Sequence, residues 1–485
     1  MRVPFGLARA AGAACAVWAV TGSTGAAAQV GALASTAPTF AGCGDGQGPP
    51  PPDQADCVAR EATEPPDFSW APRAVLAVPR LAFRTTTEVL MLGARVEDDY
   101  HLSRHVEDIF FNDARTFGVY PAFAYGTGIG AGVGMALVHK DLAGHREGLR
   151  LRAAYAGPYR QLYDAKVHSG RSWSPLRPSL LVGYRLDDSK RFYGLGNAEA
   201  EDVSELMEPL PLDAQQSGPA VHTQFRVEEV HANAAVDLAL GGNFSTGVLH
   251  AWRVRRISSG SPDDFDAPWS DEVFAPESLV GFERELVDAY SELALTWDTR
   301  RAVRADMPRA LPGAGWRARV WTGLQAGVTD PDLTFGRAGF DLQPFIDLYR
   351  GDRILHLRLR GASALGPIDQ IPFPDMPSLG GSQLLRGYNT DRYRGRATLL
   401  ASAEYRYPIQ ESLAAYVFTD AGRAWPGFED VTLQSLADVR VGFGAGVQIY
   451  SARAALFRGQ IATSIDGGVF VHLKVNTSDD FGSTY

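Results

Sequence analysis

From about residue 113 onward, the chain is a long series of short segments in which apolar and polar residues alternate. In 352–364, for example, a charged residue separates two apolar ones at Leu357, Arg358 and Leu359. Side chains two apart share a face of a strand, so one face of each segment is apolar and the other is polar. Roughly sixteen segments approach the length of a tilted strand that spans a bilayer. They lie near 116–126, 128–139, 147–156, 159–170, 177–185, 221–240, 243–254, 286–298, 316–326, 334–347, 352–364, 396–407, 412–421, 438–450, 453–463 and 468–476.

The connections between these segments are sorted by length. The long ones all follow odd-numbered segments: 186–220, 255–285, 365–395 and 422–437. Most connections after even-numbered segments are short: those near Gly241, Gly351, Pro408 and Ser451, with 299–315 as the exception. A soluble sandwich has no reason to sort its loops in this way, whereas long outer loops and short inner turns are typical of an outer-membrane barrel. The sequence therefore predicts an all-β fold, a sixteen-stranded antiparallel transmembrane β-barrel over residues 113–485.

The first 28 residues are typical of a secretory signal peptide. Arg2 and Arg9 precede a run rich in Ala, which ends in a small-residue cleavage pattern at Ala26, Ala27 and Ala28. The alternative is an uncleaved anchor, but the run is short and full of Gly and Ala. Beyond the signal, no run of about eighteen apolar residues occurs, which excludes a helical membrane protein.

Residues 29–79 are rich in Pro, Gly and Ala, and we interpret them as a flexible periplasmic leader. Cys43 and Cys57 lie within this stretch and are the only cysteines after the signal. An even pair in an exported protein indicates a disulfide, with two free thiols as the alternative.

Residues 80–112 have helical spacing, with Val89, Leu92 and Val96 near one stripe, so we predict a periplasmic helix there. His101 and His105 lie four apart and could share a metal ion. Without further ligands a solvated helix face explains them better, so no metal site is predicted.

Glycines recur at every second position in two of the predicted strands, from Gly126 to Gly134 and from Gly442 to Gly446. No helix start follows them, so they are not phosphate-binding motifs. Glycine inside a strand often marks the close approach of another backbone. Two interpretations stay open: the glycines make room for a segment folded into the barrel, or they serve barrel curvature.

Three motifs in the last third of the chain resemble the BamA/TamA family of outer-membrane barrels, also called bacterial surface antigen proteins. They are SLGGSQLLRGY at 378–388, AEYRYP at 403–408 and FTDAGRAW at 418–425, with weaker counterparts in RFYGLGN at 191–197 and LTWDTR at 295–300. The resemblance covers roughly residues 115–476 and implies a sixteen-stranded barrel. It also implies that the loop carrying LRGY folds back into the lumen as a lid.

In this family the LRGY arginine pairs with the aspartate of the FxDxG strand and with a glutamate on the strand before. The implied lid-loop and luminal network is therefore Arg386, Gly387, Tyr388, Glu404, Asp420 and Gly422. A hairpin turn at Pro408–Glu411 would place Glu404 and Asp420 several residues apart along the barrel axis. We therefore expect Arg386 to reach Asp420 well and Glu404 poorly; the alternative is a surface arginine on a solvated loop.

The resemblance implies a role in protein insertion or translocation at the outer membrane of a Gram-negative bacterium, after export through a cleaved signal peptide. The expected partners are outer-membrane lipid and unfolded outer-membrane or exported proteins. Members with this role usually carry POTRA modules before the barrel, and residues 29–112 contain no βααββ pattern, which puts the delivery of clients in question. The last strand is predicted to end near Asn476, which leaves Phe481 and Tyr485 beyond it.

Other functions are less well supported. A gated or passive pore for small solutes, using the same lumen, is the main alternative. We predict no enzyme and no cofactor, because the chain has no GxSxG motif and spacing alone assembles no Ser/His/Asp set. The net charge of -10 argues against nucleic-acid binding.

Overall fold

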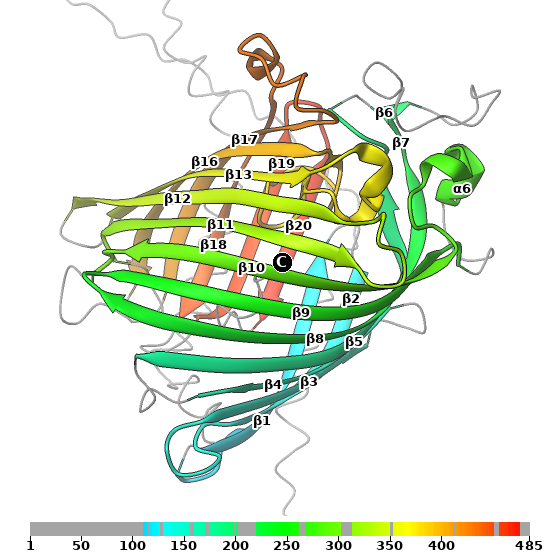
Figure 1. Ribbon diagram of the computed structural model, residues 1–485. Coiled ribbons are helices and arrows are strands. Elements are labelled where there is room, and N and C mark those ends of the chain that lie inside the picture. The colour runs from blue at the N-terminus through cyan, green and yellow to red at the C-terminus, as the bar shows by residue number, and fades with distance from the viewer. Residues whose placement is uncertain are drawn as a thin grey trace, which may run out of the picture. The chain divides into compact units, whose positions relative to one another are not determined.

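The computed structural model describes residues 110–114, 116–126, 130–155, 160–169, 175–197, 200–201, 220–260, 267–301, 313–349, 353–410, 413–450 and 455–475. Sixteen antiparallel strands follow one another around a closed barrel (Figure 1). They are β1 (Phe117–Gly126), β2 (Gly130–His139), β3 (Gly148–Tyr155), β4 (Arg160–His168), β5 (Leu176–Phe192), β8 (Thr223–Gly241), β9 (Phe244–Ser258), β10 (Arg284–Asp298), β11 (Gly315–Gly327), β12 (Phe335–Tyr349), β13 (Arg353–Leu365), β16 (Ala397–Gln410), β17 (Leu413–Trp425), β18 (Arg440–Tyr450), β19 (Ala455–Ser464) and β20 (Val469–Val475). The predicted fold class is confirmed.

The remaining described elements are short and belong to the connections. They are β6 (Ala200–Glu201), β7 (Ala220–Val221), β14 (Ser378–Leu379), β15 (Tyr393–Arg394), α6 (Ser270–Val273) and the 3-10 turns η5 (Pro276–Ser278), η6 (Ile368–Gln370), η7 (Phe373–Asp375) and η8 (Ser435–Ala437). The connection between β10 and β11 is longer than the others on its side of the barrel. A β-bridge between Arg301 and Ala314 joins its two ends. No helix in the described ranges is long and apolar enough to cross a membrane.

Several strands end later than the sequence predicts. β9 continues to Ser258 and β17 to Trp425, each four residues past its predicted end. β5 continues to Phe192, past a register shift between Asp187 and Lys190. The hairpin turn predicted at Pro408–Glu411 is wrong, because β16 continues to Gln410. The register of β16 with β17 shifts between Pro408 and Gln410. Proline lacks a backbone donor and is tolerated in a strand at such an irregularity.

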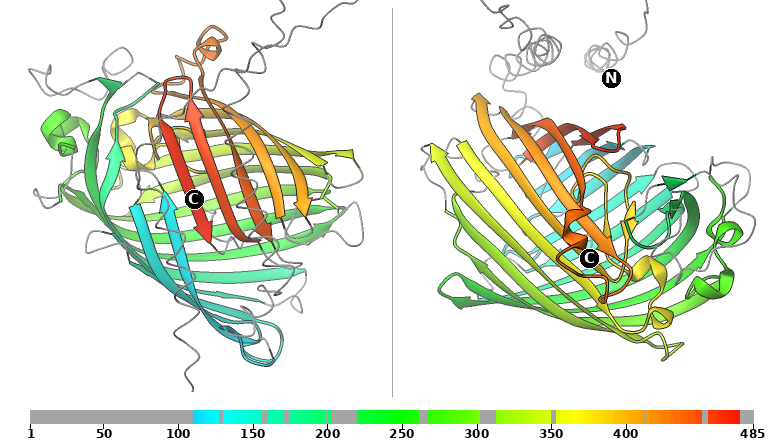
Figure 2. Two further views of the ribbon diagram at one scale, coloured as in Figure 1. Left: turned by 180° about the vertical axis from the view of Figure 1, so that it is seen from behind. Right: turned by 90° about the horizontal axis from the view of Figure 1, so that it is seen from above.

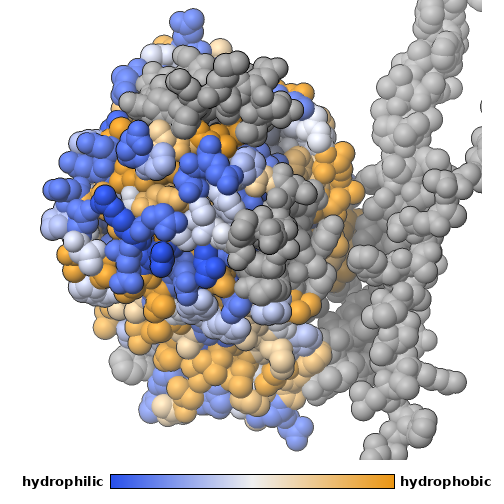
Figure 3. All heavy atoms as spheres, turned by 90° about the vertical axis from the view of Figure 1, so that its right-hand side faces the viewer, coloured by the Kyte–Doolittle hydropathy of each residue, from blue (hydrophilic) through white to orange (hydrophobic). Residues whose placement is uncertain are grey.

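The two faces of the barrel wall have opposite character. Large apolar side chains on the outer face are about half exposed, as at Trp252, Leu293 and Phe443. Charged residues on the inner face are buried, as at Arg255 and Asp288. This is the reverse of a soluble protein and fits a wall with lipid outside and a polar lumen inside. In the space-filling view, hydrophilic residues gather at one end of the barrel and hydrophobic ones along its flank (Figure 3).

The barrel is closed by a short contact between its first and last strands. Within the described ranges, β1 and β20 pair only at Ala124–Lys474, Tyr125–Leu473 and Gly126–His472. By contrast, β1 is paired with β2 along its whole length, from Phe117 to Gly126. We call this short β1–β20 contact the seam.

The end of the barrel that carries the long connections is filled by an apolar cluster. Phe373 lies in its centre, with ring centroids 4.6 Å from Phe192 and 4.9 Å from Phe225. These rings come from the connection after β13, from β5 and from β8, and α6 contributes the buried Val273. The cluster packs the long connections against the strand ends on that side of the barrel.

Several predictions concern residues outside the described ranges. These are the signal peptide, the leader with Cys43 and Cys57, His101 and His105, the predicted helix apart from its last three residues, and the chain after residue 475.

Candidate functional site

The connection from β13 to β16, residues 366–396, folds into the barrel, and we call it the inner loop. It lies inside the ring of strands (Figure 2). Its middle part contacts the inner wall: Gln460 Nε2 donates to the Ser382 carbonyl at 2.8 Å, and the Tyr388 hydroxyl donates to the Val441 carbonyl at 3.2 Å. Gly387 has φ +96° and lies so close to β19 that a Cβ atom would be 2.3 Å from the Thr463 carbonyl oxygen. Only glycine fits there.

Arg386, the residue before this glycine, is bound to β17 through Asp420. Its Nε donates to Asp420 Oδ2 and its Nη2 to Asp420 Oδ1, both at 2.8 Å, and its backbone N–H also donates to Oδ2 at 2.8 Å. The two side chains are only 6% and 1% exposed. The guanidinium also stacks on the Phe418 ring, with its Cζ 3.6 Å from the centroid. Such a bidentate, charge-assisted pair fixes the orientation of the arginine as well as its position.

Glu404 on β16 also binds Arg386, with Nη1 donating to its Oε2 at 2.7 Å. The expectation that Arg386 would reach Glu404 poorly is therefore wrong. The reason is the hairpin register: Asp420 lies opposite Ser402, so Glu404 is only two residues away along β16. Glu404 has a second cationic partner, because Arg458 Nη2 donates to the same oxygen at 2.9 Å. We call this network the Arg386 anchor.

The glycines of β17 and β18 leave the space that the inner loop occupies. A Cβ atom on Gly442 would lie 1.7 Å from the Arg386 carbonyl oxygen, and one on Gly422 would lie 2.9 Å from the Leu379 side chain. The interpretation that glycines make room for a folded-in segment is thus supported for Gly442 on β18. A Cβ atom on Gly444 or Gly446 would instead meet the neighbouring strand β19, at its carbonyl oxygens. The same is true on β2, because a Cβ atom on Gly134 would meet the backbone of the neighbouring strand, 2.5 Å from the Ala153 carbonyl oxygen.

A second charged contact holds the inner loop nearer its start, at Asp375 in η7. Arg255 on β9 and Arg337 on β12 both donate to its carboxylate, the latter at 2.8 Å. Arg253 on β9 lies 3.4 Å away. Asp375 is only 4% exposed, so one buried carboxylate of the loop faces three arginines of the wall. Asp288 on β10 is the other carboxylate here, 2.8 Å from Arg253 and 3.1 Å from Arg255. We call this network the Asp375 anchor.

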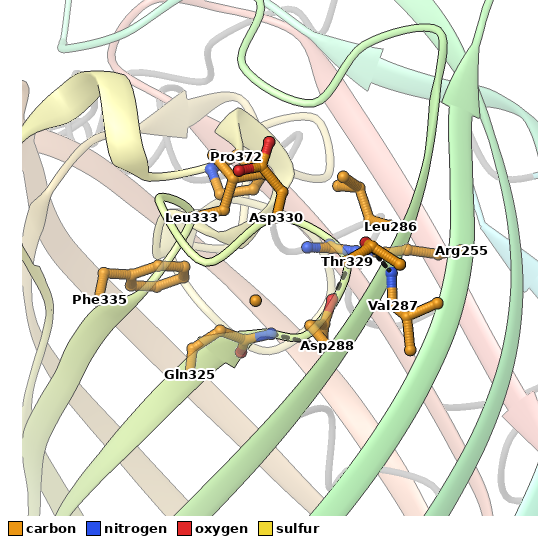
Figure 4. A pocket seen from close by; sticks show the side chains of 11 residues that line it. Arg255, Leu286, Val287, Asp288, Gln325, Thr329, Asp330, Leu333, Phe335 and Pro372 are labelled. Carbon is orange, nitrogen blue, oxygen red and sulfur yellow. Dashed lines mark hydrogen bonds and ion pairs between the residues drawn. The ribbon is translucent and has the colours of Figure 1, made fainter.

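A small cavity lies beside the Asp375 anchor. Its volume of about 10 Å³ is the size of one water molecule. Figure 4 shows Arg255, Asp288 and Gln325 on one side of it and Phe335 and Pro372 on the other. Gln325 Nε2 donates to Asp288, so β11 is tied to the same group of charges.

The charges around each anchor determine its ionisation. Burial alone would raise the pKa of Asp375, but Arg255, Arg253 and Arg337 outweigh it and hold that pKa well below its ordinary value. Burial would lower the pKa of Arg386, but its bonds to Asp420 and the charge of Glu404 raise it instead. Asp375 and Arg386 are therefore both charged at neutral pH.

The inner loop is also braced by its own residues. Arg394 is 2% exposed and its Nη1 donates to three carbonyls of the loop, those of Phe373, Pro374 and Met376. The RFYGLGN segment joins it, because the Gly196 N–H donates to the Arg394 carbonyl at 2.7 Å. The two halves of the loop are thereby tied to each other.

Sequence reasoning missed the Asp375 anchor and Arg458. The predicted strand 243–254 ended one residue before Arg255, and nothing in the sequence marked Asp375 within its Pro-rich surroundings. One signal was available: the alternation in 334–347 places Arg337 on the inner face, which makes it a candidate ion-pair partner for a loop carboxylate. In the described part of the chain, no group of His, Cys, Asp and Glu could hold a metal ion.

A closed antiparallel barrel with an apolar outer face, a polar lumen and a loop anchored within it belongs to the transmembrane β-barrels. Residues 293–468 match the family model of the Omp85 superfamily domain. The matched segment runs from within β10 to beyond the end of β19 and includes the inner loop with its motifs, so this finding supports the resemblance found there.

Among solved structures, the fold is similar to the crystal structure of BamA from Haemophilus ducreyi lacking POTRA domains 1-3. The TM-score is 0.51 and the identity 14%, over 74% of this chain and 70% of that chain. CdiB from Acinetobacter baumannii and CdiB from Escherichia coli both give a TM-score of 0.45, with 11% and 10% identity. Each aligns with 74% of this chain, which covers 59% and 62% of the two CdiB chains, less than two thirds of their length. No curated protein matches the sequence.

Proposed function

We propose that this chain is an outer-membrane barrel that takes part in inserting or translocating proteins, with the inner loop as the lid of its lumen. The Arg386 anchor is the observation that carries this proposal. Ordering a loop costs about 1–2 kcal/mol of backbone entropy per residue, so a loop held inside a lumen needs strong contacts. A buried arginine bound to two carboxylates supplies such a contact at one point, where it can also be undone.

The proposed activity is mechanical and includes no covalent step. The seam is the weakest lateral contact of the wall, because β1 and β20 share only three residue pairs in the described part of the chain. Opening it would expose two strand edges, and an unpaired edge is a template for another strand. The clients would be unfolded outer-membrane or exported proteins, and the apolar outer face would contact membrane lipid.

Site-specific photo-crosslinking in cells tests this proposal. A photoreactive amino acid at position 469, where Val469 on the last strand is 66% exposed, should form adducts with other outer-membrane or exported proteins. The matched control is position 293, where Leu293 on β10 is 54% exposed and distant from the seam in the strand order. Adducts at 469 but not at 293 support the proposal. Equal adducts at both positions, or none, contradict it.

A gated pore for small solutes is the second candidate, and the polar lumen around the inner loop favours it. Single-channel conductance in planar bilayers, with wild type beside Arg386→Ala, tests the lid itself. A nearly closed wild type that opens on substitution supports the lid and keeps both functions. A wide, steady pore that ignores the substitution contradicts the lid and leaves a plain pore. A lid that opens, without any adducts at position 469, favours the gated pore.

A further inference from the structure

The inner wall formed by β10 to β13 carries a group of arginines, although the whole chain carries a net charge of -10. The five arginines lie on neighbouring strands and just after β10: Arg300, Arg317, Arg319, Arg358 and Arg360. In the described ranges, Glu292, Asp298 and Asp341 form ion pairs with them, and Asp347 has the same strand parity as Asp341 on β12. This group is separate from the residues of the two anchors.

The three carboxylates are already occupied. Asp341 accepts from Arg358 at both oxygens, at 3.0 and 2.7 Å, so Arg360 is left at 3.5 Å from it. Asp298 is held in the same bidentate manner by Arg300, at 2.9 and 2.7 Å.

Glu292 accepts from Arg319 at one oxygen and from the Tyr290 hydroxyl at the other. Arg317 makes no hydrogen bond or ion pair within the described ranges. Arg317 thus lies near Asp341 and Asp298 without a hydrogen bond to either, and Arg360 has only a long contact with Asp341.

Trp321 organises these arginines. Its ring lies 5.2 Å from the Arg319 guanidinium carbon and 5.4 Å from that of Arg360. Gly339 on β12 leaves space for the indole ring, since a Cβ atom there would lie 2.2 Å from the ring. The two arginine side chains keep 32% and 28% exposure. Stacking on an aromatic face fixes a guanidinium while its N–H groups stay free to donate.

We propose that Arg319 and Arg360, which lie beside Trp321, form with Arg317 on the same face of β11 a binding site for an oxyanion, a carboxylate or a phosphate group. Two partly exposed guanidiniums held beside one indole, with a third two residues before Arg319, offer charged donors to such a group. The site lies on the wall of the lumen and does not require the inner loop to move. It is therefore independent of the proposed lid and of protein translocation.

Calorimetric titration of the whole detergent-solubilised barrel at low ionic strength tests the site. The probes are inorganic phosphate and hexaglutamate, which carry the two oxyanion groups. The variant Arg317→Gln/Arg360→Gln should weaken binding about tenfold or more, because it removes two charged donors. The variant Arg256→Gln/Arg284→Gln changes the net charge equally, at side chains 61% and 69% exposed, and should bind like wild type.

The single variant Arg360→Lys keeps the charge and removes the planar fork, so it should give an intermediate loss even if the double variant does not fold. Binding of phosphate supports a site for a free ion, and binding of hexaglutamate alone supports a site for acidic segments of a polypeptide. No binding of either probe by wild type overturns the proposal. Equal binding by wild type and Arg360→Lys, with an equal loss in both double variants, also overturns it, because general charge would then explain the result.

Discussion

The two anchors of the inner loop are built with opposite charge arrangements. At one, the loop supplies a single cation, Arg386, to two carboxylates of the wall. At the other, the loop supplies a single carboxylate, Asp375, to three arginines of the wall. Both are buried, so the Coulomb terms are little screened by water. The two anchors differ in the charges that remain on the wall when the loop dissociates from it.

At the Arg386 anchor the remaining charges are partly balanced. Glu404 keeps Arg458, and Asp420 keeps the hydroxyl of Ser402. At the Asp375 anchor, Arg253 and Arg255 would keep Asp288, with Glu229 also near them, whereas Arg337 would keep no ion pair within the described ranges. An unpaired buried charge is costly, so the Asp375 anchor is the harder one to release. The comparison shows the inner loop as fixed near its start and releasable near Arg386.

The largest effect is expected from Asp375→Asn. It removes the loop's charge from the three-arginine group and should lower the free energy of unfolding by about 3–5 kcal/mol. Thermal unfolding of the purified barrel, followed by circular dichroism, measures the change. The control is Asp369→Asn, an exposed carboxylate of the same loop, which should stay near wild type. Equal stability of the two variants would remove the second anchor from the comparison.

Arg386→Ala should have the second-largest effect, about 1.5–3 kcal/mol, since it removes charge-assisted hydrogen bonds but leaves Glu404 paired. Arg386→Lys keeps the charge, loses the bidentate geometry and should fall between Arg386→Ala and wild type. The same unfolding measurement ranks them. A loss larger than that of Asp375→Asn would reverse the order of the two anchors.

Gly442→Ala should destabilise by about 1–3 kcal/mol, because the added methyl group collides with the Arg386 carbonyl and displaces the loop. Gly336→Ala is the matched control: the nearest atom to its Cβ would be the Leu365 Cβ, at 3.2 Å, which is tight but far less so than the contact at Gly442. Partial proteolysis of the inner loop reports the displacement directly. Similar digestion of both variants would show that the loop does not depend on Gly442.

The smallest expected effect is the pH dependence of the stability that Asp375 contributes. The pKa of Asp375 is depressed in the folded protein, so its contribution is present above the unfolded pKa of about 3.9 and is lost only as the pH falls through the lower folded value. The stability difference between wild type and Asp375→Asn should therefore be the same at pH 7 and pH 5. Unfolding at both values checks this, and a difference that disappears at pH 5 would mean that Asp375 is protonated there.

The sequence predicted the barrel well because alternation is a local property. All sixteen segments correspond to strands, since a period of two residues needs no knowledge of distant contacts. The expectation that Arg386 would reach Glu404 poorly was wrong because the turn between the two strands was misplaced. Ending the strand at Tyr407 instead of Gln410 shifts the hairpin register, and register decides which side chains meet.

The Asp375 anchor could not be predicted for a different reason. Its arginines lie on β9 and β12, and their meeting depends on the path of an irregular loop. The Arg386 contacts were found only because a family motif named them. Nothing in the spacing of LRGY and FTDAG specifies the distance between Arg386 and Asp420.

The two anchors also differ in their separation along the chain, with consequences for the order of assembly. Arg386 and Asp420 are 34 residues apart, and Arg337 and Asp375 are 38 apart, but the Asp375 anchor also needs Arg255, which is 120 residues from Asp375. Closing the longer segment costs about 1 kcal/mol more in chain entropy, and distant contacts form more slowly. The hairpin of β16 and β17 can therefore capture the arginine while the rest of the sheet is still incomplete. The wall would then close around a loop already in place, which spares the finished barrel from threading it through a filled end.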